Sequence, residues 1–255
     1  MKIIVAIKQV PSRDSALAVA SGGGWVDETD LTYEVNEPDA YALEEGLQLK
    51  EKHGGEVVVL CLGPSGAAST IREALAKGAD RAIHIEEDAT GLDTLATARL
   101  LAKAVAAENA DLILTGLQSD DLGYGQTGVV LAEQLGCAHS TIIMQVETAE
   151  GGIRVKRELE DGWFQHIHLP LPAVLTIQSG INKLRYATLM GIKKAKSKEI
   201  RRLTAAELGA PVQTSAVIEK IYPPQKSKQT QILEGAAAEV AARLAEKLKF
   251  EVRVI

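Results

Sequence analysis

Cysteine and long apolar runs are scarce in this chain of 255 residues, and both absences narrow the class of protein. Cys61 and Cys137 lie 76 positions apart, which predicts neither a disulfide framework nor a structural zinc site. The longest apolar runs, residues 3–7 and 57–62, are far shorter than the about 20 residues of a membrane helix. The first of them is also too short for the core of a signal peptide. We therefore expect a cytoplasmic protein that is not embedded in a membrane.

Aromatic residues are also few, at 4% of the chain, and the net charge is only −6. A small acidic charge argues against a surface built for nucleic acid. The charge is uneven: residues 183–202, here called the basic segment, hold eight basic residues and one acid, whereas residues 1–182 carry a net −14. Such a run is typical of a solvated surface or a linker, and the alternative is a docking surface for an acidic partner or for phosphates. Its one aromatic residue, Tyr186, offers too little base stacking for a nucleic-acid partner.

Strand and helix patterns alternate through the first 135 residues. Short runs rich in Val, Ile and Leu, typical of strands buried on both faces of a parallel sheet, occupy residues 3–7, 56–62, 82–85 and 112–114. Apolar residues at helical spacing follow them, at residues 40–47, 67–77, 95–105 and 127–135. This order predicts an α/β fold with a doubly wound, mostly parallel sheet.

Beyond Gly136 the pattern changes to alternating residues separated by turn sequences. It predicts antiparallel strands added to one edge of the sheet, and then a further strand of the main sheet, at residues 141–147, 153–159, 163–169 and 173–177. The last part of the chain contains a break at Pro223 and Pro224 and one more helical pattern from Ala237 to Leu248. A segment of this size buries little apolar surface alone. We therefore predict an α/β domain over residues 1–192 and a C-terminal arm over residues 193–255 that wraps a partner subunit.

A glycine-rich stretch follows the fourth strand pattern and is the sequence most suggestive of a binding site. Gly123 and Gly125 let backbone N–H groups approach an anion, and the helix from Thr127 presents unpaired donors. Because open α/β sheets bind ligands at the carboxyl ends of their strands, a phosphate group is the natural occupant. The spacing is neither that of a P-loop nor the Rossmann fingerprint. Two alternatives stay open: the glycines only form a tight turn, or Asp120 and Asp121 repel a phosphate unless a ribose hydroxyl or a metal is near.

Other candidates for chemistry are weaker. His166 and His168 share one face of a strand, but no third ligand stands near them in the sequence, so no metal site is predicted. No Ser/His/Asp or Cys/His arrangement has a recognisable spacing, so no catalytic residue is assigned. Asp39 is expected to cap the helix that follows it, which does not exclude a second role at the carboxyl-terminal edge of the sheet.

Several separated motifs, in the same order along the chain, resemble the small, or β, subunit of electron-transfer flavoproteins. The most specific is Ile-Arg-Glu-Ala-Leu-Ala-Lys-Gly-Ala-Asp-Arg-Ala at residues 71–82, and Gly-Gln-Thr-Gly at residues 125–128 is similar to the Asn-Gln-Thr-Gly of the family's nucleotide loop. The other matching motifs lie at residues 5–10, 36–52, 169–176 and 184–189. The resemblance covers nearly the whole chain and implies a sheet of the Rossmann-like or adenine-nucleotide α-hydrolase-like kind.

The resemblance implies an electron carrier and not an enzyme. In this family a larger α subunit holds most of the contacts to a redox-active FAD, and in most members the β subunit holds a buried AMP as a structural ligand. Carried over by position, the residues expected to bind AMP are Ala6, Asn36, Glu37, Pro38, Asp39, Leu62, Gly116, Leu117, Gln118, Ser119, Asp120, Asp121, Leu122, Gly123, Tyr124, Gly125, Gln126 and Thr127.

The resemblance also implies a segment that recognises dehydrogenases, with an apolar anchor, Leu189, that enters a pocket on acyl-CoA dehydrogenases. Basic charge around such an anchor speeds the encounter with an acidic partner. Members of the family then pass the electrons to a membrane quinone oxidoreductase. The resemblance thus implies a role in fatty acid oxidation. The residues that correspond to the segment are Arg185, Tyr186, Ala187, Thr188, Leu189, Met190, Gly191, Ile192, Lys193 and Lys194.

The sequence departs from the family pattern at two places, and two alternative functions stay open. Residues 11–13 stand where many members have a Tyr near the flavin, so Arg13 is an alternative contact to the flavin or its phosphates. Asn-Lys-Leu-Arg-Tyr at residues 182–186 replaces Asn-Glu-Pro-Arg-Tyr, which changes the expected choice of dehydrogenase. One alternative is an electron-bifurcating relative with a second FAD, whose loop differs from residues 121–129. The other is a homodimeric nucleotide-binding stress or regulatory protein, which would have little use for residues 203–255.

Overall fold

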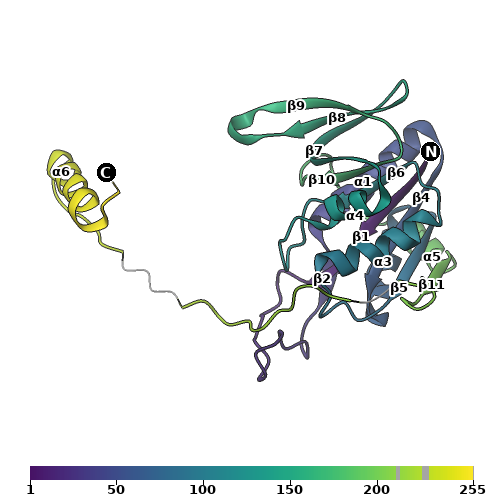
Figure 1. The fold of residues 1–255 in the computed structure, drawn as a ribbon, viewed down its shortest axis with the longest axis horizontal. Helices are drawn as coiled ribbons and strands as arrows, with labels where there is room; N and C mark the ends of the chain where they lie inside the picture. Colours follow the sequence, from purple (N-terminus) through teal and green to yellow (C-terminus); the bar gives the residue numbers. More distant parts are fainter. Residues whose placement is uncertain (211–212, 226–229, 255) are drawn as a thin grey trace. The chain divides into compact units, whose positions relative to one another are not determined.

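A nine-stranded sheet with helices on both faces forms the body of the protein (Figure 1). The computed structural model describes residues 1–210, 213–225 and 230–254. The chain divides into two units, Met1–Ile221 and Tyr222–Ile255. The sheet lies in the first unit, with the strand order β11-β5-β4-β1-β6-β10-β7-β8-β9. The predicted α/β fold with a mostly parallel sheet is confirmed.

The central strands are parallel and almost completely buried. Ile3 of β1 lies level with Val57 on one side and with Leu112 on the other, and side chains alternate between the two faces of the sheet. All the strands predicted for this region are present, and they are β1 (Lys2–Ile7), β4 (Glu56–Gly63), β5 (Arg81–Glu86), β6 (Leu112–Gly116) and β10 (Ala173–Ile177).

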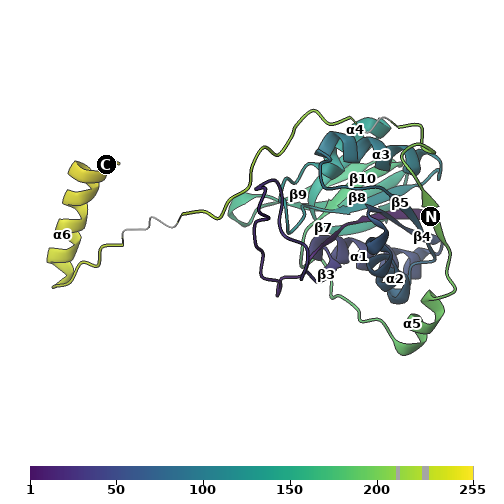
Figure 2. The ribbon, with the colours of Figure 1, turned by 90° about the horizontal axis from the view of Figure 1, so that it is seen from below.

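Two helices cover each face of this central sheet, as Figure 2 shows. The four are α1 (Glu37–His53), α2 (Ala68–Lys77), α3 (Thr94–Ala106) and α4 (Thr127–Leu135). Leu43 of α1 and Ile71 of α2 pack in the core on one face, and Leu100 of α3 and Leu131 of α4 pack in the core on the other. Short helices η1 (Ser65–Ala67) and η2 (Glu160–Gly162) complete the connections.

The antiparallel edge is formed by β7 (Ala138–Ala149), β8 (Gly152–Glu158) and β9 (Phe164–Leu169). β7 is shared between the two kinds of pairing, because it runs parallel to β10 and antiparallel to β8. The predicted antiparallel strands are therefore confirmed. A small antiparallel pair that the sequence pattern did not reveal, β2 (Gln9–Pro11) with β3 (Tyr33–Val35), lies just beyond β1.

The basic segment is part of the first unit. It contains α5 (Leu189–Ala195) and leads into β11 (Ile200–Leu203), which pairs in parallel with β5 at the edge of the sheet. Arg72 of α2 fastens the stretch between them, since its Nη1 donates to the carbonyls of Ala195 at 2.5 Å and Lys198 at 2.7 Å. The sequence pattern did not predict this short helix or this edge strand, because both lie in a run of charged residues. The arginines of β11 face solvent.

The division between the two units therefore falls after Ile221, later than the boundary expected between residues 192 and 193. The second unit contains the predicted helix, α6 (Ala237–Lys247), followed by a π-helical turn (Leu248–Val252). Neither has a buried residue. In the part of the chain that the structure describes, no helix has the length and apolar character needed to cross a membrane. That the C-terminal arm wraps a partner stays a prediction.

Candidate functional site

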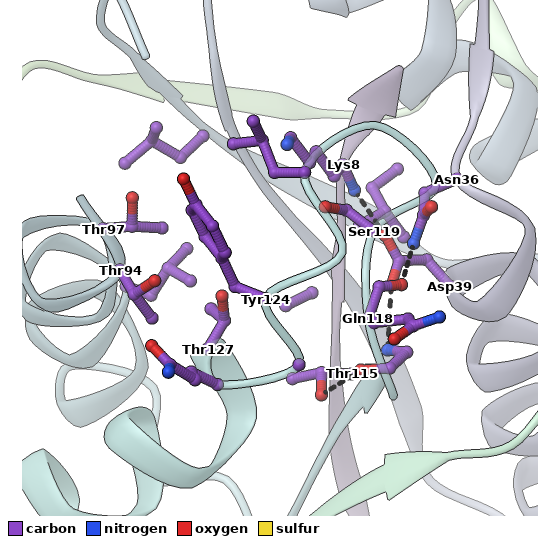
Figure 3. Close-up of a pocket in the computed structure, with 18 of the residues that line it drawn as sticks. Lys8, Asn36, Asp39, Thr94, Thr97, Thr115, Gln118, Ser119, Tyr124 and Thr127 are labelled. Atoms are coloured by element: carbon purple, nitrogen blue, oxygen red, sulfur yellow. Dashed lines mark hydrogen bonds between the residues drawn. The ribbon is translucent and has the colours of Figure 1, made fainter. Parts of the chain in front are cut away.

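The carboxyl ends of β1, β4 and β6 meet at one edge of the sheet, where a cavity opens (Figure 3). β4 and β5 lie on one side of β1, and β6 and β10 lie on the other. Such a switch point is where open α/β sheets bind ligands. Most of the residues predicted to bind a nucleotide line this cavity, namely Ala6, Asn36, Asp39, Leu62, Gly116, Leu117, Gln118, Ser119, Leu122, Tyr124, Gly125, Gln126 and Thr127.

The cavity has further walls that the sequence reasoning missed. These residues are Ile7, Lys8, Ala89, Leu92, Thr94, Thr97, Leu101 and Thr115. Several come from the first turns of α3 and the loop before it, which follow the carboxyl end of β5. Their position after a parallel strand is the sequence signal that could have identified them as lining residues. Five predicted residues do not line the cavity, namely Glu37, Pro38, Asp120, Asp121 and Gly123.

Asp39 joins the ends of β1 and β6 at the floor of the cavity. Its carboxylate accepts hydrogen bonds from the backbone N–H groups of Lys8 and Gly116, both at 2.8 Å. The prediction that Asp39 caps α1 is wrong: Pro38 lies in the first turn, so α1 already begins at Glu37 and Asp39 lies within it. Burial raises the pKa of Asp39 to about 7, against the opposing effect of the two N–H bonds.

Asn36 fastens the glycine-rich loop to the start of α1. Its Nδ2 donates to the carbonyl of Gln118 at 3.0 Å, and its Oδ1 accepts from the N–H of Asp120 at 2.8 Å. Only 1% of its surface is exposed. Gly123 and Gly125 have positive φ angles of 64° and 63°, which residues with a Cβ rarely adopt. Asn36 therefore fastens the loop to the start of α1 on either side of Ser119.

The two loop aspartates are occupied by partners within the protein. Lys8 Nζ contacts Asp121 Oδ2 at 2.6 Å. The Asp120 carboxylate accepts from the N–H of Glu37 at 3.1 Å and lies 3.7 Å from the Arg13 guanidinium. These contacts reduce the repulsion that the aspartates would exert on a bound phosphate. Arg13 also forms an ion pair with Glu37, and its approach to a flavin stays a prediction.

Gly116 is closely packed, and we expect Gly116→Ala to lower the free energy of unfolding by about 1–3 kcal/mol. A Cβ there would collide with the Asp39 carboxylate and lie 2.7 Å from Pro38 Cβ. Gly66→Ala is the matched control, because a Cβ at Gly66 meets nothing within 4 Å. Urea unfolding of both variants measures the difference. Equal stabilities would show that the floor of the cavity yields to the extra methyl group.

The lining offers groups that suit each part of a nucleotide. Leu62, Leu92 and Leu101 offer apolar surface to a planar base. Hydroxyl groups at Ser119 and Thr97 suit a ribose. The N-terminus of α4, where Gln126 makes no capping hydrogen bond with its side chain, supplies backbone N–H groups for a phosphate. Among the described residues, no group of three or more His, Cys, Asp or Glu could hold a metal ion.

The residues predicted to recognise dehydrogenases form an exposed corner that ends in α5 (Figure 2). Tyr186 is 94% exposed and Leu189 is 89% exposed, and Met190 and Ile192 beside them are also exposed. Thr188 caps α5 by accepting a hydrogen bond from the N–H of Gly191 at 3.0 Å. Neighbouring exposed apolar side chains of this kind are typical of a surface that binds another protein.

Arg185 holds the base of this corner to α1. Its Nε donates to Glu44 Oε2 at 2.7 Å, and its Nη1 donates to Glu51 Oε1 at 2.6 Å. Hydrogen bonds with both carboxylates raise the pKa of Arg185 above its usual range. Arg185 thus positions the exposed residues that follow it, and its own charge is engaged within the protein.

Comparison with known proteins identifies the family. Residues 23–208 match the family model described as "Electron transfer flavoprotein domain". The chain belongs to the electron transfer flavoprotein family. It is 37% identical to the electron transfer flavoprotein subunit beta of Methylophilus methylotrophus, over 96% of each chain. It is 36% identical to that of Bradyrhizobium diazoefficiens, over the whole of both chains, and 36% identical to that of Mus musculus, over 98% of this chain and 97% of the relative.

The predicted resemblance to the β subunits of electron transfer flavoproteins is therefore confirmed. Both features described above lie largely within the matched range, because the cavity and the exposed corner are formed by residues 6–127 and 185–194. Family membership supports a role in electron transfer involving a flavin. The individual contacts of Ala6, Asn36 and the glycine-rich loop with a nucleotide stay predictions.

Proposed function

We propose that this chain is the β subunit of a heterodimeric electron transfer flavoprotein. In this proposal the chain holds one AMP as a structural ligand, and an α subunit holds most of the contacts to a redox-active FAD. The complex accepts electrons from flavin dehydrogenases such as acyl-CoA dehydrogenases and passes them to a membrane quinone oxidoreductase. The cytoplasm stays the predicted location. The observation that carries the proposal is the similarity to β subunits over the full length of the chain.

Co-expression with a candidate α subunit tests the heterodimer. We expect the two chains to co-purify as one complex with the absorption spectrum of a bound flavin. The matched control is the chain expressed alone, for which size measurement gives the mass of a homodimer if it is a self-associating regulatory protein. A co-purified complex that stays colourless after FAD is added would contradict the proposal, and so would a stable homodimer that ignores the α subunit.

The ligand of this chain is tested by acid extraction of the purified complex. We expect AMP and FAD in equal amounts, because the lining of the cavity suits one base, one ribose and one phosphate. Two equivalents of FAD without AMP would instead identify an electron-bifurcating complex. The glycine-rich loop of this chain favours AMP, since bulky Tyr124 projects into the cavity between Thr97 and Lys8 (Figure 3).

The exposed corner is the surface proposed to meet the dehydrogenases. Leu189 supplies the apolar anchor, and Lys193 and Lys194 of α5 supply positive charge beside it. A positive rim around an apolar contact suits an acidic partner surface. The second unit is proposed to lie against the α subunit, since the apolar side chains of α6, such as Leu244, are not buried in this chain.

A further inference from the structure

Residues 213–221, here called the tether, connect the first unit to the second and are fastened to the rim of the cavity. The N–H groups of Ser215 and Ala216 both donate to Asp93 Oδ2, at 2.5 Å and 3.0 Å. Further along, the N–H of Ile221 donates to the carbonyl of Gly23 at 2.9 Å. The tether is the last stretch of the first unit and is thus attached to the rest of that unit at two points before the second unit begins.

Asp93 serves two elements at once. Its Oδ1 accepts from the N–H of Ala96 at 2.8 Å and so caps α3, while its Oδ2 holds the tether. Hydrogen bonds from these backbone groups hold the pKa of Asp93 below its usual range, so the carboxylate is charged at neutral pH. A charged acceptor forms stronger hydrogen bonds with N–H groups than a neutral one does.

The tether and the nucleotide cavity share a wall. Val217 and Ile218 of the tether line a second hollow together with Trp25. That hollow adjoins the nucleotide cavity, and the residues lining both are Ala89, Leu92, Thr94, Leu122, Tyr124 and Gln126. A ligand that orders these residues from the side of the cavity therefore also orders the surface on which the tether lies.

We propose that Asp93 is a positioning residue that couples nucleotide binding to docking of the tether. The inference rests on the proposed AMP site. A nucleotide that restrains the start of α3 and the loop at Tyr124 reduces the conformational freedom that the tether must lose when it docks. By linkage, the docked tether strengthens nucleotide binding by the same factor. Occupancy of the cavity thereby favours one path of the chain toward the second unit.

Hydrogen exchange of the full chain, stripped of nucleotide and then loaded with AMP, tests the coupling. We expect AMP to slow exchange in residues 117–127 and in the tether. Asp93→Ser keeps a cap for α3, because Ser is as good an N-cap as Asp, but its single oxygen cannot also hold the tether. In this variant, tether exchange should be fast with or without AMP, and the Kd for AMP should rise about fivefold or more.

Asp88→Ser is the matched control, since the Asp88 carboxylate accepts from the N–H of Thr90 at 2.9 Å in the loop before Asp93. It should behave as the unmodified chain does. Protection of residues 117–127 by AMP without protection of the tether would overturn the coupling and leave the nucleotide site standing. Protection of neither region would overturn the nucleotide site as well. Equal tether exchange in the two Ser variants would show that Asp93 does not hold the tether.

Discussion

Asp39→Ala is expected to lower the free energy of unfolding by about 2–6 kcal/mol, because it leaves one buried and one half-buried N–H group without an acceptor, each at about 1–3 kcal/mol. Those groups belong to Lys8 and Gly116, at the carboxyl ends of β1 and β6, two of the strands that border the cavity. Urea unfolding followed by circular dichroism measures the loss. Asp27→Ala is the control, since the exposed Asp27 side chain accepts its hydrogen bonds from Thr29, two residues away.

Asp39→Asn adds a pH dependence to the same measurement. Burial raises the pKa of Asp39 to about 7, whereas an Asp in an unfolded chain titrates near 3.9. Between about pH 4 and pH 7 the folded protein therefore holds a proton that the unfolded chain releases, so the contribution of Asp39 to stability falls as the pH rises. Asn does not titrate. The advantage of the unmodified chain over Asp39→Asn should narrow across this window, and an advantage that widens would contradict the raised pKa.

Leu189→Ala is expected to slow electron acceptance from a dehydrogenase by about 30-fold at limiting protein concentration. An apolar anchor at the centre of an interface commonly contributes about 2 kcal/mol, and each 1.4 kcal/mol is a factor of ten. Leu189 is 89% exposed, so its truncation should change the free energy of unfolding by less than about 0.5 kcal/mol. Flavin reduction, followed by absorbance with the αβ complex as acceptor, measures the effect.

The matched control for Leu189 is Leu17→Ala. Leu17 is also a well exposed leucine, at 63%, but it lies in the segment between β2 and β3, outside the exposed corner. It should leave the rate of reduction unchanged, and both variants should keep one FAD per complex. Equal rates for Leu189→Ala and Leu17→Ala with every dehydrogenase tried would rule out Leu189 as the anchor.

Much of the fold could be predicted because its strands have a simple pattern. Residues 3–7 and 57–62 are continuous apolar runs, which suit strands covered on both faces. β11 could not be found in the same way, because only Ile200 and Leu203 of its four residues are apolar. An edge strand needs at most one covered face, so it can contain arginines. These give its sequence the pattern of a solvated segment.

The part of the site that one continuous segment forms could be predicted from the sequence. The parts that depend on packing between distant segments could not. The loop at residues 116–127 could be predicted as a binding loop because its glycines follow a buried strand. Thr94 and Thr97 contribute to the same cavity from α3, whose residues carry no binding motif and indicate a ligand only by following a parallel strand. The role of Asp39 was misassigned because capping is a local pattern, whereas its two donors come from residues 31 and 77 positions away.

Arg185 and other cations of the basic segment are paired within the protein, and this weakens the electrostatic attraction that the segment exerts on a distant partner. Arg185 is paired with Glu44 and Glu51, Arg202 is paired with Glu86, and Lys198 donates to carbonyls of α2 and the turn after it. An approaching protein meets mainly the lysines around α5, whose field fades within a Debye length of about 8 Å in physiological salt. The net +7 of residues 183–202, from eight basic residues and one acid, therefore overstates the attraction. In the proposed recognition of dehydrogenases, the small positive spot around Leu189 orients the partner at the last stage of approach.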